Sequence, residues 1–210
     1  MLEKFKTIRT DGSHEIILKK SRFICHLKRT ATEEEATRFI QQIKQKEKKA
    51  NHNCSAYIIG EHDEHQRAHD DGEPSGTAGV PMLDVLKKQE LKNVTAVVTR
   101  YFGGIKLGKG GLVRAYSTAV SEAVKELGVV ERSLYQEIHL TVPYTLSGKT
   151  ENSLKESSYI LRDIQYTDKV TFVCYVPIVQ TQNFISETTQ WLNDQGNYQL
   201  KEKKYMEIPI

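Results

Sequence analysis

Cysteine and long apolar runs are both scarce in this 210-residue sequence. The three cysteines, Cys25, Cys54 and Cys174, lie far apart and form no Cys-x-x-Cys motif. Their spacing argues against zinc and dithiol motifs, and it favours buried thiols in a reducing compartment over a redox or nucleophilic cysteine. The longest apolar runs, such as residues 94–98, have the length of a strand and are too short to span a membrane. The first residues lack the apolar core of a secretory signal, so we expect a cytoplasmic protein with no membrane partner.

An excess of charge of one sign is also missing. The chain has 30 Lys and Arg against 27 Asp and Glu, which gives a net charge of +3. This balance does not require a nucleic-acid partner, so any such function depends on where the cations lie. With 38% hydrophobic and 27% charged residues, the composition is that of a globular protein, long enough for one large domain or two small ones.

The first part of the chain predicts strands and three helices. Strand-like segments are expected at residues 5–10, 15–29, 54–60 and 94–99, with a turn at Asp11 and Gly12. Thr32 and Glu35 form a capping box that opens a helix with one apolar face. Further helices are expected at residues 81–89, with a proline in the first turn, and 112–127, ending at Gly128. The polar residues 61–69 predict a loop.

The last part of the chain predicts a second fold. Its elements are expected at residues 135–143, 145–157, 160–167, 169–178, 181–194 and 197–208. Their order, β-α-β-β-α-β, is that of a ferredoxin-like domain. We therefore predict an α/β (α+β) protein with two domains, residues 1–130 and 131–210, joined near residues 130–134.

The segment RYFGGIKLGKGGLVRAY, residues 100–116, contains a glycine-rich turn between a strand and a helix. Gly103, Gly108 and Lys109 have the spacing of a nucleotide phosphate loop, but Gly110 stands where a Ser or Thr would bind magnesium. A dinucleotide-binding motif would need glycine at Val113. Both differences argue against a nucleotide hydrolase and a dinucleotide-binding domain.

A strand, a glycine turn and a helix start can still form an anion site, because glycines and the helix N-terminus present N–H groups to a ligand. Four cations and two aromatic residues lie in the same segment, and an exposed aromatic ring can stack on a base. The candidate phosphate- or nucleic-acid-binding residues are Arg100, Tyr101, Phe102, Gly103, Gly104, Lys106, Gly108, Lys109, Gly110 and Arg114. The alternative, in which the glycines and aromatics only pack and the cations are solvated, stays open.

A second segment, DDGEPSGTAGVP (residues 70–81, called the acidic loop below), combines carboxylates with small residues before a helix start. Its candidate functional residues are Asp70, Asp71, Glu73, Ser75 and Thr77. The carboxylates could bind a divalent cation or act as acid and base, whereas Asp and Gly equally suit a tight turn. Ser75 has no paired base in the sequence.

The three histidines at positions 62, 65 and 69 have a spacing that would bring imidazoles together on a helix. Their polar surroundings favour a surface loop over a metal site. We predict no catalytic residue, no metal and no cofactor, and metal binding by His62, His65 and His69 stays open.

Taken together, DDGEPSGTAGVPMLDVL and NVTAVVTRYFGGIKLGKGGLVRAYSTAV resemble the signature of the IMPACT family, in its bacterial YigZ/YvyE-type branch. The matching positions are Asp70 to Gly79, Arg100 to Gly104, Lys106, Gly108, Gly111 and Arg114. The two-domain order agrees with this resemblance along essentially the whole chain.

The resemblance implies folds and a role. It implies a first domain like the second domain of ribosomal protein S5, and a ferredoxin-like second domain like the C-terminal domain of elongation factor G. It implies regulation linked to translation, with RNA or the ribosome as partner, or a translation factor as a further possible partner. It supplies no catalytic residues. The alternative is an enzyme acting on a phosphorylated small molecule, with the carboxylates of the acidic loop as acid, base or metal ligands. The oligomeric state is not indicated.

Overall fold

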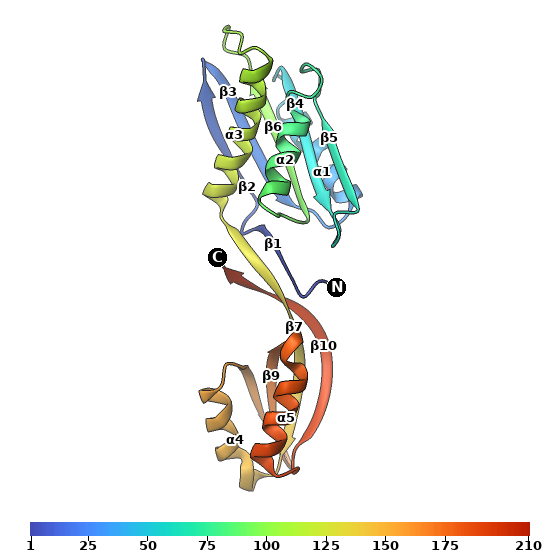
Figure 1. The fold of residues 1–210 in the computed structure, drawn as a ribbon, viewed down its shortest axis with the longest axis vertical. Coiled ribbons are helices and arrows are strands. Elements are labelled where there is room, and N and C mark those ends of the chain that lie inside the picture. The colour runs from blue at the N-terminus through green and yellow to red at the C-terminus, as the bar shows by residue number, and fades with distance from the viewer. The chain divides into compact units, whose positions relative to one another are not determined.

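A computed structural model describes all 210 residues of the chain as an α/β protein with two five-stranded sheets (Figure 1). The chain divides into two compact units. The first holds Phe5–Glu131 with Ile208–Ile210, and the second holds Arg132–Glu207 with Met1–Lys4. The predicted α/β class is confirmed. Residues 130–134, expected to join two domains, belong to a continuous strand, β7 (Val129–Val142).

The sheet of the first unit has the strand order β2-β3-β6-β4-β5, and neighbouring strands are antiparallel. These strands are β2 (Gly12–Leu18), β3 (Ser21–Arg29), β4 (His52–Ile59), β5 (His65–His69) and β6 (Val94–Tyr101). The central strand β6 is buried along its whole length up to Tyr101. Continuous burial indicates that both faces of the sheet are covered at its centre.

Helices cover the two faces of this sheet. They are α1 (Glu33–Lys46), α2 (Gly79–Lys88) and α3 (Lys109–Leu127). Cys54, Ala56 and Ile58 of β4 join the large core formed with α2 and α3. Tyr57 and Ile59 pack with α1 instead, because successive residues of a strand point to opposite faces. Figure 1 shows α2 and α3 side by side on one face, with α1 behind the sheet.

Several local predictions are confirmed, and some elements begin or end at other residues than predicted. Helix α1 begins after Thr32, whose hydroxyl accepts a hydrogen bond from the Glu35 amide at 3.2 Å. Helices α2 and α3 begin two to three residues before the predicted starts, at Gly79 and Lys109. The segment predicted as one strand at residues 15–29 forms two strands, with a tight turn at residues 19–20.

The prediction of a loop at residues 61–69 is wrong for its second half. His65–His69 form β5, an edge strand that pairs with β4. Four of the five residues of this edge strand are exposed and Ala68 is half-buried, so apolar alternation is not required and the polar sequence gave no strand signal.

The second unit follows the predicted β-α-β-β-α-β order. Its elements are β7, α4 (Tyr144–Glu156), β8 (Ile160–Tyr166), β9 (Val170–Pro177), α5 (Thr181–Leu192) and β10 (Asn197–Pro209), with a short 3-10 turn at Ile178–Gln180. Strand β7 pairs with β9, β9 with β8, and both β10 and β1 (Lys4–Ile8) pair with β7. A buried cluster of residues from both sheet and helices fills its core, including an edge-to-face contact of Tyr159 with Phe184. None of the helices in the chain combines the length and hydropathy that crossing a membrane requires.

Candidate functional site

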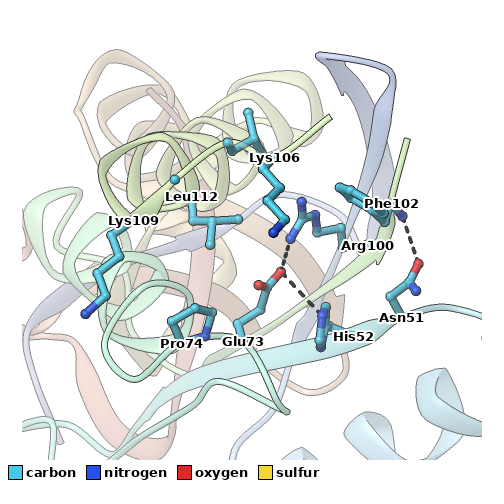
Figure 2. A pocket seen from close by; sticks show the side chains of 11 residues that line it. Asn51, His52, Glu73, Pro74, Arg100, Phe102, Lys106, Lys109 and Leu112 are labelled. Atoms are coloured by element: carbon cyan, nitrogen blue, oxygen red, sulfur yellow. Dashed lines mark hydrogen bonds and ion pairs between the residues drawn. The ribbon is translucent and has the colours of Figure 1, made fainter. Parts of the chain in front are cut away.

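A pocket of about 440 Å³ lies in the first unit, where β6 ends and where β4 and α3 begin. Figure 2 shows side chains from these elements and from the acidic loop converging on it. Its lining residues are Asn51, His52, Glu73, Pro74, Arg100, Phe102, Lys106, Leu107, Gly108, Lys109 and Leu112. The volume falls in the range of small-molecule sites, roughly 300–1,000 Å³.

The alternation of side chains along β6 places Arg100 at the base of this pocket. Val94, Ala96 and Val98 of β6 belong to the core formed with α2 and α3, so Arg100 points to that same face. In the sheet, Arg100 is the register partner of His52 on β4, which puts the two side chains next to each other. Arg100 is consequently almost fully buried, at 5% exposure.

A carboxylate neutralises this buried guanidinium. One oxygen of Glu73, Oε1, accepts hydrogen bonds from Arg100 Nη1 at 2.6 Å and from the Tyr116 hydroxyl at 2.8 Å. The Glu73 side chain is only 3% exposed. Because an unpaired buried charge is costly, this pairing is what allows either charge to stay in the core.

His52 completes the polar group at the pocket base. Its Nδ1 lies 2.9 Å from the Asp71 carbonyl oxygen, which can only accept a hydrogen bond, so Nδ1 carries the proton. The other nitrogen, Nε2, lies 3.9 Å from Glu73 Oε1. A second proton on His52 would therefore create an ion pair with Glu73.

Two neutral donors are linked to Glu73: the Tyr116 hydroxyl donates to it, and the Cys54 thiol donates to the Tyr116 hydroxyl. Burial raises the pKa of the Cys54 thiol to about 12, and burial together with nearby Cys54 raises the pKa of Tyr116 far above its usual range. Both groups therefore stay protonated at neutral pH. All three cysteines are buried and none forms a disulfide, which agrees with the expected buried thiols.

The rim of the pocket is cationic. Lys106 and Lys109 are exposed, and Figure 2 shows both side chains at the pocket wall formed by the loop and the start of α3. Gly108 caps α3 at a φ of 72°, without a capping side chain, and the first turn holds no acidic residue. The first N–H groups of α3 therefore have no acceptor from a cap, and the helix dipole adds partial positive charge.

The structure gathers half of the predicted phosphate-binding residues at the pocket. Those that line it are Arg100, Phe102, Lys106, Gly108 and Lys109. Tyr101 points to the opposite face of the sheet, where its hydroxyl donates to Glu47 at 2.7 Å. Gly103, Gly104 and Gly110 shape the loop and the helix start without lining the pocket, and Arg114 is exposed farther along α3.

Most polar side chains of the acidic loop bond backbone groups or Lys44 and do not line the pocket. Asp70 accepts hydrogen bonds from the amides of Gly76, Ala78 and Gly79. Asp71 accepts from the Lys44 ammonium and the Asn53 amide. The Thr77 hydroxyl donates to the Pro74 carbonyl at 2.7 Å, and Ser75 is exposed. Among the five candidates of this loop, only Glu73 lines the pocket.

The three histidines of the polar segment do not come together as ligands. His65 lies 3.3 Å from Glu33, and His69 accepts a hydrogen bond from the Asp71 amide. No group of three or more His, Cys, Asp or Glu side chains in the chain has an arrangement suited to a metal ion.

Sequence reasoning missed His52, Asn51 and Tyr116. Asn51 holds the loop by accepting a hydrogen bond from the Phe102 amide at 2.8 Å. His52 reaches the site only through the register of β4 against β6. Tyr116 lies within the helix predicted at residues 112–127, and its position sixteen residues after Arg100 carried no sign that its hydroxyl bonds Glu73.

Fold and site together define a two-domain α/β protein with a pocket that holds a buried ion pair at its base and cations at its rim. Residues 19–124 match the Impact N-terminal domain, and residues 140–195 match a domain of unknown function, DUF1949. IMPACT family member YvyE of Bacillus subtilis is 53% identical over 210 residues, which cover 100% of this chain and 97% of the relative. IMPACT family member YigZ of Escherichia coli is 40% identical over 151 residues, covering 68% and 74% of the two chains.

A solved structure, described as the crystal structure of a hypothetical protein, is also similar. It is 29% identical with a TM-score of 0.61, and the match covers 96% of this chain and 99% of that one. The chain belongs to the IMPACT family.

Asp70 provides a test of the acidic loop as a structural element. Burial raises its pKa, but the three amide hydrogen bonds outweigh burial and leave the pKa below its usual value. Asp70→Asn should lower the free energy of unfolding at pH 7 by about 1–2 kcal/mol, a modest loss because the side chain is partly exposed. A carboxyl whose pKa is lower in the folded than in the unfolded protein stabilises the folded state at pH values above the unfolded-state pKa. This stabilisation is lost as the pH falls through the folded-state pKa. The difference from wild type should therefore shrink below about pH 4.

Urea denaturation across a pH series measures this difference. Asp84→Asn, which changes an exposed carboxylate on α2, the helix that follows the loop of Asp70, is the matched control and should be near neutral. An equal loss in both variants, or a difference that grows on acidification, would contradict the structural role of Asp70.

Gly103 provides a second test, of the glycine loop. A Cβ atom at this position would lie 2.1 Å from the backbone of Lys20, whereas a Cβ at Gly110 would meet nothing within 4 Å. Gly103→Ala should therefore destabilise the protein by about 1–3 kcal/mol. Gly110→Ala, in the first turn of α3, should stabilise it by up to about 1 kcal/mol. Thermal denaturation of both variants measures the contrast, and a neutral Gly103→Ala would show that the loop does not need this close approach.

Proposed function

We propose that this protein binds RNA, free or in the ribosome, in a role linked to translation, with an RNA phosphate at the N-terminus of α3. The observation that carries the proposal is the rim of the pocket. There Lys106 and Lys109 flank the uncapped start of α3, which has no acidic residue in its first turn. Lysines and helix N-termini are common phosphate contacts in nucleic-acid complexes.

Two further features support an RNA ligand. Phe102 lines the pocket with its side chain 45% exposed, and exposed aromatic rings stack on unpaired bases. Membership of the IMPACT family supports the link to translation, as the resemblance of the two signature segments implies. A translation factor is a second partner class, and a pull-down that survives nuclease and high salt would favour it.

The alternative of an enzyme acting on a phosphorylated small molecule has weaker support. Asp70 and Asp71, two of its three proposed acid, base or metal-ligand groups, hold backbone amides and Lys44 instead. Neither of them lines the pocket. Only Glu73 is left for such a role, and one of its oxygens already accepts two hydrogen bonds.

The RNA-binding proposal is tested by removing the two lysines of the rim. Lys106→Ala/Lys109→Ala should weaken binding to single-stranded RNA and to ribosomes. The slope of log K against log salt should become shallower by about 1.4, because each phosphate contact to a single strand contributes about 0.7. Fluorescence anisotropy of labelled RNA from about 50 to 200 mM salt measures both quantities.

The matched control is Lys87→Ala/Lys88→Ala, which removes two exposed lysines at the far end of α2 in the same unit. Its slope should stay close to that of the wild type. A rim variant that binds RNA as tightly as the wild type, with the same salt dependence, would refute the proposal.

A further inference from the structure

The two ends of the pocket differ in charge. Glu73 provides a buried carboxylate at the base, and Lys106, Lys109 and the start of α3 provide positive charge at the rim. The ion pair with Arg100 leaves the base close to neutral, so the rim is the end that attracts an anion such as phosphate, while the base offers the second oxygen of Glu73 as an acceptor. The pocket therefore suits an elongated ligand with an anionic group at one end and hydrogen-bond donors at the other.

The base of the pocket holds polar atoms that the protein leaves unused. Glu73 Oε1 accepts two hydrogen bonds, whereas Oε2 accepts none. In Figure 2 this second oxygen points away from Arg100 and His52. The Arg100 side chain is 7% exposed and donates one hydrogen bond, from Nη1 to Glu73, which leaves Nη2 as a donor for a ligand. Its Nε also has no partner but is buried out of a ligand's reach. Buried polar groups are normally satisfied, so unused ones beside a cavity point to a ligand.

The walls between these two ends are apolar. Phe102 presents an exposed ring, and Pro74, Leu107 and Leu112 add carbon surface. A flat aromatic ligand gains stacking on Phe102 and loses little on leaving water. An unused acceptor and unused donors at the base then match the edge of a nucleobase, which carries donors and acceptors in one plane.

We infer that the pocket binds one nucleotide, with its phosphate at the start of α3, its base against Phe102 and its base edge toward Glu73 and Arg100. The inference rests on the proposed RNA-phosphate site and names the unit that this site receives. A free nucleotide and a nucleotide of an RNA chain share this chemistry. The 440 Å³ volume lies in the range for small-molecule pockets.

The unused carboxylate oxygen predicts a base preference. The amino group N4 of cytosine can donate to Glu73 Oε2, and carboxylate side chains accept from this group in nucleic-acid complexes. Uracil has an acceptor, O4, at the same place, which Glu73 would repel. Cytidine 5′-monophosphate should therefore bind at least about threefold more tightly than uridine 5′-monophosphate. This ratio corresponds to about half of the discrimination energy of one bidentate base contact, because Glu73 offers one free oxygen.

Titration calorimetry with the two monophosphates, cytidine and inorganic phosphate tests the inference. Cytidine monophosphate should bind more tightly than cytidine or phosphate alone, since only it fills both ends of the pocket. Phe102→Ala should weaken it by about tenfold, as expected for a lost stacking contact. Ile17→Ala, an exposed apolar residue on β2 at 66% exposure, is the control and should bind as the wild type does.

Glu73→Gln tests the base edge without removing the side chain. Its amide oxygen can still accept from Arg100 and Tyr116, while its NH₂ group places a donor where Oε2 was. The preference should then reverse in favour of uridine monophosphate. Should this variant fail to fold, Phe102→Ala still decides. Wild-type protein that binds neither monophosphate, or binds both unchanged after Phe102→Ala, overturns the inference.

Competition with RNA separates this inference from the proposed function. Cytidine monophosphate that displaces linear RNA but not a circular RNA of the same sequence supports capture of a terminal nucleotide. Displacement of both supports an internal nucleotide, and displacement of neither supports a free nucleotide as the ligand. Lysine-dependent RNA binding without any monophosphate binding would overturn the one-nucleotide pocket and leave the RNA proposal standing. Monophosphate binding without RNA binding would overturn the RNA proposal and leave the one-nucleotide pocket standing.

Discussion

The buried ion pair of Glu73 with Arg100 is the contact on which the rest of the site depends. Its 2.6 Å hydrogen bond joins the acidic loop to the end of β6, and Tyr116 brings α3 to the same carboxylate oxygen. Three segments that are distant in sequence thus meet at one atom. Removing one partner of a buried pair leaves an uncompensated charge and typically costs about 3–5 kcal/mol. The pair therefore fixes where loop, strand and helix lie relative to one another.

This pairing also decides which charges a ligand meets. Arg100 is the most buried of the four cations in its segment, and Glu73 neutralises it. The outward positive charge comes from Lys106, Lys109 and the α3 terminus instead. A net charge of +3 over the chain conceals this arrangement, because the local field depends on a few groups around one helix start.

Local patterns in the sequence predicted much of the fold. The capping box at Thr32 and the β-α-β-β-α-β order are encoded within short windows, so both were visible without tertiary information. Strand β5 was not visible, because an exposed edge strand such as His65–His69 has no buried face to impose alternation. The start of α3 was placed three residues late, because Gly110 and Gly111 have low helix propensity and are held in the helix by their context.

The site was less predictable than the fold. It depends on the register between strands and on which of several possible partners each polar side chain bonds. The glycine segment indicated an anion site, but burial of Arg100 follows from its place on the core face of β6. His52 enters only because β4 pairs with β6 in one particular register. Three carboxylates within four residues gave no means of telling which one faces the pocket. That choice is made by the amides of Gly76, Ala78 and Gly79, which bind Asp70, and by Lys44, which binds Asp71.

The fixed roles of Asp70 and Asp71 give Glu73 its direction. Asp70 ties the loop to the start of α2, and Asp71 ties it to α1 through Lys44 and to β4 through Asn53. Held at both of these points, the loop has one remaining acidic side chain, and that side chain reaches Arg100. The two segments that resemble the family signature, residues 70–79 and 100–114, therefore contribute the base and the rim of one pocket. Their association in the sequence signature has a physical reason, since neither segment forms that pocket without the other.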